Sequence, residues 1–248
     1  MSVRAYVVDA KFETLAALRT PGFAIPFIAI PVAIYLLFGV VIAGNAGATS
    51  ELGPGVANYL LCGFMVLAVA MPGVFTGVIL ATDREGRLLD LKRALPLPTG
   101  ATVVSKVLMA MGISTLAVSL IVIAALLAGK STLSTGQVAV MAAVLIPGSI
   151  PFCAIGLLIG TVSSASAAPA WGNLVFLPMM WLSGLFIPLP DSLEQWVIVW
   201  PTFHLNQVAL AAAGVTEFVF IPPAMAAAVL VGVTVICGGL AIRRLGLG

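Results

Sequence analysis

The chain has 248 residues, of which 61% are hydrophobic and only 8% carry a charge. An ordinary soluble domain is about 25% charged, because Lys, Glu, Asp and Arg cover most of its water-facing surface. This composition excludes a soluble enzyme, a nucleic-acid-binding protein and a disordered scaffold. Much of the chain must face lipid, so the positions of the charges matter more than the net charge of +2.

The first 22 residues precede the first long apolar run. Seven small or apolar residues lie on one stripe at helical spacing, and the charged residues lie off it. We expect a helix over 1–22 that lies in the cytoplasmic membrane interface and turns into the first span at Pro21 and Gly22. A mobile polar tail is the alternative. The stripe comprises Val3, Tyr6, Val7, Ala10, Thr14, Ala17 and Leu18, and the charged residues off it are Arg4, Asp9, Lys11 and Glu13.

Uncharged runs of about 20 residues mark helices that are long enough to cross a bilayer. Six runs of roughly this kind follow one another, and one of them contains a charge, Lys106, about one turn from its start. A lysine stem in that position can reach the lipid headgroups, so we expect Lys106 to snorkel. The sequence thus predicts an all-α polytopic membrane protein with a single transmembrane domain over 1–248. The predicted spans are 23–43, 57–81, 103–128, 137–162, 170–187 and 219–242.

The orientation follows from the distribution of Lys and Arg. One side receives nine of them, with Lys106 at its edge, whereas the opposite loops 44–56, 129–136 and 188–218 contain only Lys130. Both termini are therefore predicted to be cytoplasmic. The nine are Arg4, Lys11, Arg19, Arg84, Arg87, Lys92, Arg93, Arg243 and Arg244.

The predicted cytoplasmic loop 82–102 concentrates seven of the twenty charges of the chain within residues 83–93. Leucines alternate with charges of both signs, a pattern that suits recognition of a protein better than attachment to a membrane, which would be mainly basic. We expect a short helix presented to a cytoplasmic partner. A positively charged anchor with no partner is the alternative.

Two glycine pairs, Gly73 with Gly77 and Gly156 with Gly160, have the G-x-x-x-G spacing that lets membrane helices approach closely. They predict tight helix packing, either within the chain or between chains.

The predicted external segment 188–218 contains apolar stretches that are too short to cross a bilayer. We expect two short helices packed on the end of the fifth span, the first ended by Pro201. Trp196 and Trp200 are four residues apart, as expected of rings at the membrane interface. His204 and Glu194 could form a catalytic or metal-binding pair, but a structural role is favoured because the chain has only one His.

Motifs for other chemistry are weak. The sequence AALLAGKS at 124–131 lacks the first glycine of a phosphate-binding loop and follows a membrane span, so nucleotide binding is not predicted. Cys62, Cys153 and Cys237 lie within spans and predict neither disulfides nor a metal site.

Four stretches together resemble the permease subunits of type-2 ATP-binding-cassette (ABC) exporters. LAALRTPGFAIPFIAIPVAIYLLFG at 15–39 is similar to the interfacial helix and first span of that family. REGRLLDLKRALPLPTGATVVSK at 84–106 is similar to its cytoplasmic coupling segment, and SGLFIPLPDSLEQWVIVWPTFHLNQ at 183–207 to its external hairpin. The closing span before Arg243 is the fourth.

The resemblance implies half of an export pathway: a non-catalytic permease that pairs with a second permease chain, identical or different, and with two ABC ATP-binding subunits. ATP and Mg would bind the partner, and this chain would need no cofactor. The implied location is a bacterial cytoplasmic membrane, and the implied cargo is an amphipathic, lipid-like, drug or glycan-type substrate.

The resemblance also assigns roles to particular residues. The family run E-G-T-L-E-x-L has Arg87 and Leu89 here in place of Thr and Glu, so either Glu85 or Asp90 would face the partner. The implied coupling residues are Arg84, Glu85, Arg87, Asp90, Lys92 and Arg93. The implied hairpin or gate residues are Pro188, Pro190, Trp196, Trp200, Pro201 and His204.

A second hypothesis stays open, namely a stand-alone membrane carrier or an integral membrane enzyme that uses His204 and Glu194.

Overall fold

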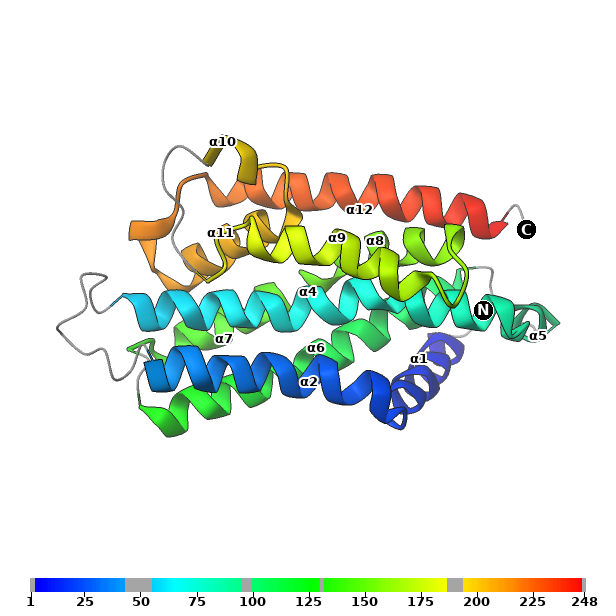
Figure 1. The fold of residues 1–248 in the computed structure, drawn as a ribbon, viewed down its shortest axis with the longest axis horizontal. Coiled ribbons are helices and arrows are strands. Elements are labelled where there is room, and N and C mark those ends of the chain that lie inside the picture. Colours follow the sequence, from blue (N-terminus) through cyan, green and yellow to red (C-terminus); the bar gives the residue numbers. More distant parts are fainter. Residues whose placement is uncertain (1–2, 43–54, 95–99, 130–131, 187–193, 247–248) are drawn as a thin grey trace.

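The computed structural model describes residues 3–42, 55–94, 100–129, 132–186 and 194–246. These residues form an elongated bundle of helices, with no strand among them (Figure 1). The predicted all-α membrane fold is confirmed. Within the described ranges, five helical segments are long and apolar enough to cross a membrane: Pro21–Ile42, Val56–Glu85, Ala101–Ala128, Thr135–Val162 and Pro223–Gly246.

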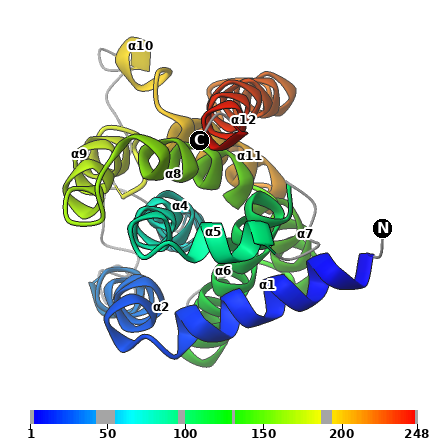
Figure 2. The same cartoon turned by 90° about the vertical axis from the view of Figure 1, so that its right-hand side faces the viewer.

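The N-terminal helix α1 (Val3–Leu18) ends shortly before α2 (Pro21–Tyr35), which begins with a proline. Figure 2 shows α1 lying across one end of the bundle, as expected of a helix that does not span. The predicted stripe is only partly right. Ala10 and Ala17 are buried, but Val7 is 57% exposed. The inward face of α1 is instead completed by Asp9 and Glu13, for the reason given below.

Helix α2 continues as a π-helical segment, η1 (Leu36–Ile42), where the ring of Tyr35 packs against Gly39. The next helix, α4 (Val56–Glu85), is about 45 Å long at 1.5 Å per residue and continues four residues beyond the predicted span. It is followed by the short helix α5 (Leu88–Ala94) and by α6 (Ala101–Ala128).

The predicted fourth span is two helices, α7 (Thr135–Leu145) and α8 (Ser149–Val162). They are separated at Pro147, which has no amide hydrogen to continue the helical hydrogen bonds.

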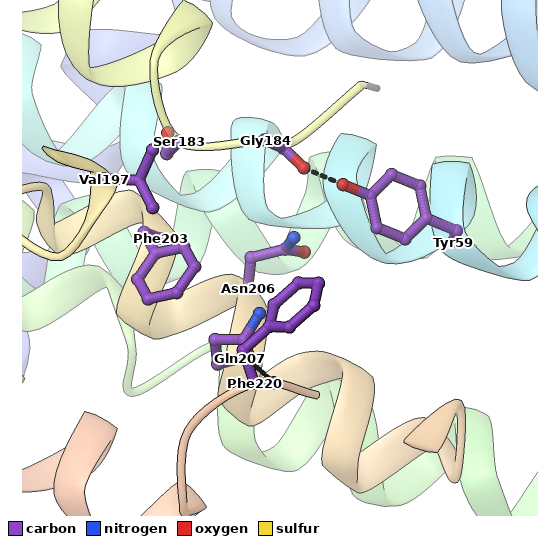
Figure 3. A pocket seen from close by; sticks show the side chains of 8 residues that line it. All are labelled: Tyr59, Ser183, Gly184, Val197, Phe203, Asn206, Gln207 and Phe220. Carbon is purple, nitrogen blue, oxygen red and sulfur yellow. Dashed lines mark hydrogen bonds between the residues drawn. The ribbon is translucent and has the colours of Figure 1, made fainter. Parts of the chain in front are cut away.

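The predicted fifth span, 170–187, is helical only over α9 (Ala168–Trp181). Its 14 residues are fewer than the about 20 needed to cross a bilayer. The helix ends where the carbonyl of Met179 accepts hydrogen bonds from the hydroxyls of Ser183 and Thr202, and Gly184 then adopts a φ of +65°. Tyr59 donates to the carbonyl of Gly184 and so joins this turn to α4 (Figure 3).

Two short helices follow, α10 (Glu194–Val197) and α11 (Pro201–Ala213). Pro201 stands at the start of α11, and α10 has already ended at Val197. Helix α11 contacts the end of the fifth span as expected, through Thr202 and Met179, but most of it lies elsewhere. It is inserted among α4, α7 and α12, and nine of its thirteen residues are buried. A single 3-10 turn, η4 (Thr216–Phe218), leads to the last span, α12 (Pro223–Gly246).

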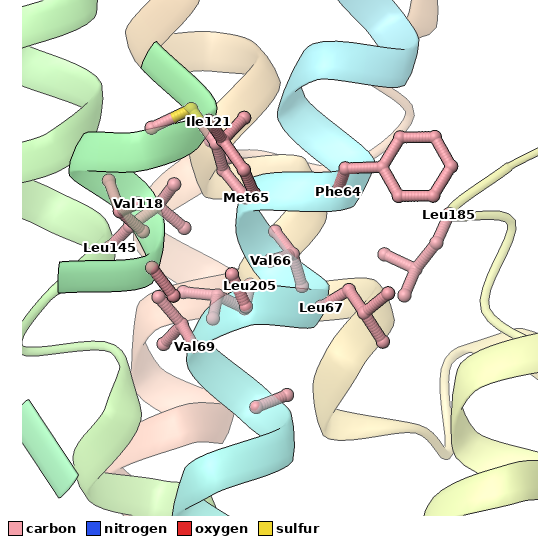
Figure 4. Close-up of a cluster of buried hydrophobic side chains, with 14 of the residues drawn as sticks. Phe64, Met65, Val66, Leu67, Val69, Val118, Ile121, Leu145, Leu185 and Leu205 are labelled. Carbon is pink, nitrogen blue, oxygen red and sulfur yellow. The ribbon is translucent and has the colours of Figure 1, made fainter. Parts of the chain in front are cut away.

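The core of the bundle is built around α4. Of its most apolar stretch 83% is buried, compared with 17% for α12, so α4 is the central helix and α12 faces outward. Figure 4 shows Phe64, Met65, Val66, Leu67 and Val69 of α4 among side chains from the surrounding helices.

Candidate functional site

Five charged side chains from four helices meet at the end of the bundle where α1 and α5 lie. Lys106 Nζ of α6 lies 2.5 Å from Asp83 Oδ2 of α4 and 2.7 Å from Glu13 Oε2 of α1. Lys92 Nζ of α5 lies 2.5 Å from Glu13 Oε1 and 3.1 Å from Asp9 Oδ1. We call these five residues the charge chain. It joins α1 and α5 to the ends of two spans.

The expected snorkelling of Lys106 is wrong. Its side chain is fully buried, and its ammonium group donates to Glu13 and Asp83. Removing an ammonium group from water is costly unless carboxylates surround it closely. The two carboxylates explain why α1, rather than lipid headgroups, covers the start of α6.

The ion pairs of the charge chain shift the pKa values of Glu13 and Lys92, two members that lie outside the spans. Burial alone would raise the pKa of Glu13, but the ion pairs with Lys106 and Lys92 outweigh this effect and lower it below 4.5. Burial would lower the pKa of Lys92, and its hydrogen bonds and ion pairs with Glu13 and Asp9 raise it above 10.5. The contact between α1 and α5 is therefore charged over the whole neutral range.

The sign of these shifts predicts how stability varies with pH. A carboxyl whose pKa is lowered by folding stabilises the fold above its ordinary pKa, and this contribution is lost as the pH falls through the lowered value. The contribution of Lys92 is complete below 10.5 and is lost as the pH rises through the raised value. We expect the difference in melting temperature between the wild type and Glu13→Gln to be constant from about pH 6 to 9 and to shrink below pH 4.5. Melting curves of both proteins in one detergent measure it, and a difference that grows on acidification would contradict the pairing.

Beside the charge chain lies an open cleft of about 520 Å³ between the ends of α4, α5, α8 and α12. Its lining combines charges of both signs with hydroxyl groups and two leucines. The lining residues are Arg84, Glu85, Leu89, Asp90, Thr161, Val162, Ser163, Ser164, Arg244 and Leu245.

The predicted coupling residues divide into two groups. Arg84, Glu85 and Asp90 line the cleft. Arg84 Nη1 donates to the carbonyl of Gly160 at 2.7 Å, and Glu85 Oε1 accepts from the amide of Ala165 at 2.9 Å. These two bonds tie the end of α4 to the end of α8 and to the turn after it.

The other three coupling residues are placed differently. Lys92 belongs to the charge chain and not to the cleft. Arg87 is exposed and links α4 to α5 with a φ of +55°. Arg93 is in α5, but its side chain lies outside the described part of the structure.

Helix α5 carries apolar side chains that its own chain leaves uncovered. Leu91 is 65% exposed and Leu88 is 40% exposed. They are three residues apart and so share one face of the helix. The cleft is lined by Leu89 and Asp90 of the same helix, so the face of Leu88 and Leu91 is a separate, exposed surface of α5.

The two glycine pairs lie against each other between α4 and α8. A Cβ atom on Gly77 would collide with the carbonyl oxygen of Gly156, and one on Gly160 would lie 2.5 Å from the carbonyl oxygen of Gly77. The close approach is thus within one chain.

The predicted hairpin residues that the structure describes are divided between α10, the residue before α11, and α11 itself. Trp196 is 73% exposed on α10, whereas Trp200 is the residue before α11, so the two rings do not share a helical face. Pro188 and Pro190 lie outside the described residues, as does Lys130, which was predicted to be external.

His204 is fully buried, and its Nε2 is bonded to the carbonyl of Ile198 at 2.7 Å. This supports a structural role. The side chain of its suggested partner, Glu194, lies outside the described part of the chain. Among the described residues, no three His, Cys, Asp or Glu side chains are grouped so that they could hold a metal ion.

The charge chain was missed as a unit by the sequence analysis. One signal was present, because Asp9 and Glu13 are four residues apart and must share a face of α1. A pair of carboxylates on one face, together with a lone lysine in a span, indicates a possible long-range pairing.

The family model described as ABC-2 type transporter matches residues 5–238, nearly the whole chain. The chain belongs to the ABC-2 type transporter family. A search of curated proteins finds no significant match.

Membership makes this chain an integral membrane permease subunit of an ABC transporter, a transport component that is generally non-catalytic. It also implies association with an ABC ATP-binding subunit. The matched range covers nearly all of α1, the five residues of the charge chain and α5.

Proposed function

We propose that this permease forms half of the pathway of an ATP-driven exporter and pairs with a second permease chain, identical or different. Two ABC ATP-binding subunits would dock at the end that holds α1 and α5, and these subunits would bind ATP and Mg. That end would be cytoplasmic in a bacterial inner membrane, with both termini on the same side. Export, rather than uptake, is inferred from the resemblance to type-2 exporters.

The observation that carries this proposal is the exposed face of α5. Leu88 and Leu91 leave apolar surface exposed on this helix, and Asp90 on its other face lines the cleft together with Glu85 and Arg244. A partner that buried this face would gain apolar contacts at its centre and charge pairs around it, the usual arrangement of a protein interface. The charge chain would connect a partner docked on α5 to the spans. Lys92 of α5 pairs with Asp9 and Glu13 of α1, and Glu13 also pairs with Lys106 of α6.

The cargo is proposed to be amphipathic or lipid-like, including drugs and glycan-linked lipids. In support, Lys106 is the one charge within the predicted spans, and it is occupied by the charge chain. An uncharged pathway suits apolar or amphipathic substrates better than ions.

The docking prediction is tested on α5 itself. The partner is the ABC ATP-binding subunit with which the permease copurifies. We expect Leu91→Ser to weaken the affinity for that subunit roughly tenfold or more, because an apolar side chain of this size contributes about 1.5–3 kcal/mol when buried. Arg87→Glu should also weaken it, with a greater loss at low ionic strength. Both side chains are exposed, so the melting temperature of the isolated permease should not change.

Lys11→Glu is the matched control, because Lys11 is an exposed cation of α1 at the same end of the bundle. It should bind the ATP-binding subunit as the wild type does. Unchanged affinity in both Leu91→Ser and Arg87→Glu would exclude α5 as the docking element.

A further inference from the structure

A small cavity lies at the other end of the bundle, between the start of α4, the turn after α9 and the inserted helix α11. Its volume is about 10 Å³, close to the space that one water molecule requires. Figure 3 shows the side chains around it. They are Tyr59, Ser183, Gly184, Val197, Phe203, Asn206, Gln207 and Phe220.

One polar atom of this lining is unsatisfied. Asn206 is 2% exposed, and its Oδ1 finds no hydrogen-bond donor among the residues that the structure describes. Buried amide oxygens in folded proteins almost always accept a hydrogen bond from protein or from ordered water. In Figure 3 the amide of Asn206 lies between the ring of Phe220 and the Tyr59–Gly184 hydrogen bond.

The neighbouring polar groups already have protein partners. Gln207 Nε2 donates to the carbonyl of Phe218 at 3.2 Å, and its Oε1 accepts from the amide of Phe220 at 2.7 Å. The hydroxyl of Ser183 is paired with Thr202 at 2.7 Å. No donor to Asn206 Oδ1 is therefore found among the described residues, and a ligand small enough for the cavity can supply one.

The groups that line the cavity define the chemistry of this ligand. It must donate a hydrogen bond to Asn206, and it can place a second one on the carbonyl of Gly184 or the oxygen of Tyr59, because each of these atoms has two acceptor positions. The eight lining residues include no Asp, Glu, Lys, Arg or His, so a neutral ligand is favoured over an ion. We propose that this cavity binds one ordered water molecule that joins Asn206 of α11 to the Tyr59–Gly184 pair.

This water would make the contact between α4 and α11 adjustable. A direct bond between two buried side chains fixes their separation, whereas a bridging water satisfies both at nearly the same enthalpy and tolerates small changes in distance. Helix α11 also packs against α7 and α12. A bridging water at Asn206 would allow α11 to shift against the central helix α4 while the side-chain amide of Asn206 keeps its hydrogen bond.

Millisecond X-ray hydroxyl-radical labelling of the purified full-length protein in detergent tests the site. Radicals form from the bound water itself, so buried rings beside ordered water are oxidised and rings in dry surroundings are not. Phe203 lines the cavity and Phe176 of α9 does not, yet both are 3% exposed. We expect Phe203 to be oxidised several-fold faster than Phe176. Equal rates for the two rings in the wild type would overturn the proposal.

Two variants at Asn206 add a direct comparison. Asn206→Leu has nearly the same size and removes the acceptor, so the oxidation rate of Phe203 should fall to that of Phe176. Asn206→Asp keeps an acceptor oxygen and should keep the faster rate. An unchanged rate at Phe203 in Asn206→Leu would contradict the water site, and if this variant does not fold, the comparison of the two rings in the wild type decides. The test needs neither substrate nor ATP-binding subunit, so its outcome is separate from that of the proposed export function.

Discussion

Replacing Lys106 with Met is expected to lower the free energy of unfolding by about 3–5 kcal/mol, the usual cost of removing one partner from a buried ion pair. The variant would leave the carboxylate of Asp83, whose side chain is 13% exposed, without its 2.5 Å contact to Lys106. Glu13 would keep Lys92, so the greater part of the loss should arise at Asp83. Denaturant titration of the purified permease in mixed micelles measures the change.

The design includes a rescue and a control. Lys106→Met combined with Asp83→Asn removes the uncompensated charge and should recover much of the lost stability, because a neutral amide is less costly to bury than a carboxylate. Lys11→Met removes an exposed lysine from α1 and should change stability by no more than about 0.5 kcal/mol. If Lys106→Met is as stable as Lys11→Met, the charge chain does not hold α1 to the bundle.

The contacts of Lys106 could not be predicted from the sequence. Lys106 is visible as a lone charge in a span, but its carboxylate partners are 93 and 23 residues away along the chain. Spacing rules within one helix do not reveal such a pairing. Snorkelling was predicted because that prediction uses only the position of Lys106 near a span end. Its burial against α1 depends on how α1, α4 and α6 are arranged, which no local pattern gives.

The spans could be predicted where apolar length alone defines them. The run 57–81 agrees with α4 because lipid and core both require apolar side chains. The helix then continues to Glu85, because Asp83 pairs with Lys106 and because Arg84 and Glu85 bond to the end of α8 and the turn after it. The run 170–187 misled the prediction because hydropathy counts Ser183 and Gly184 as acceptable in a span. Hydrogen bonds from the hydroxyls of Ser183 and Thr202 to Met179, and the positive φ of Gly184, end α9 early.

Helix α11 could be predicted as a helix but not as a buried one. Its apolar stretch is too short to cross a bilayer, which predicted a helix packed on the end of the fifth span. In the structure Thr202, Asn206 and Gln207 are each at most 2% exposed. Thr202 and Gln207 are satisfied by backbone and side-chain partners from other segments, which no local pattern encodes.

The coupling segment 82–102 could be predicted in part. Mixed charge and interleaved leucines predicted a presented helix. The structure shows a short helix with Leu88 and Leu91 exposed, and its partner stays a prediction. The division of its charges, with Lys92 turned to α1 and Glu85 turned to Ala165, depends on tertiary contacts. Glu85 is thus hydrogen-bonded within the chain, to the amide of Ala165.

Replacing Gly77 with Ala is expected to destabilise the bundle by about 3 kcal/mol, the upper part of the range for overpacking a core. The new methyl group would collide with the carbonyl oxygen of Gly156, and the amide nitrogen of Gly160 would lie 3.2 Å from it. Both contacts are backbone atoms, which do not move aside as a flexible side chain does. Relief requires α4 and α8 to separate, and this would loosen the contact between the two glycine pairs along its length.

Gly232→Ala in α12 is the matched control, because a Cβ atom there has no neighbour within 4 Å. In a helix interior the change from Gly to Ala without a clash stabilises by roughly 0.5–1 kcal/mol, so the two variants should move the free energy of unfolding in opposite directions. The opposite signs separate a clash from a general effect of alanine on membrane helices. Equal shifts would mean that α4 and α8 do not touch backbone to backbone, and the G-x-x-x-G spacing would then remain free for a contact between chains.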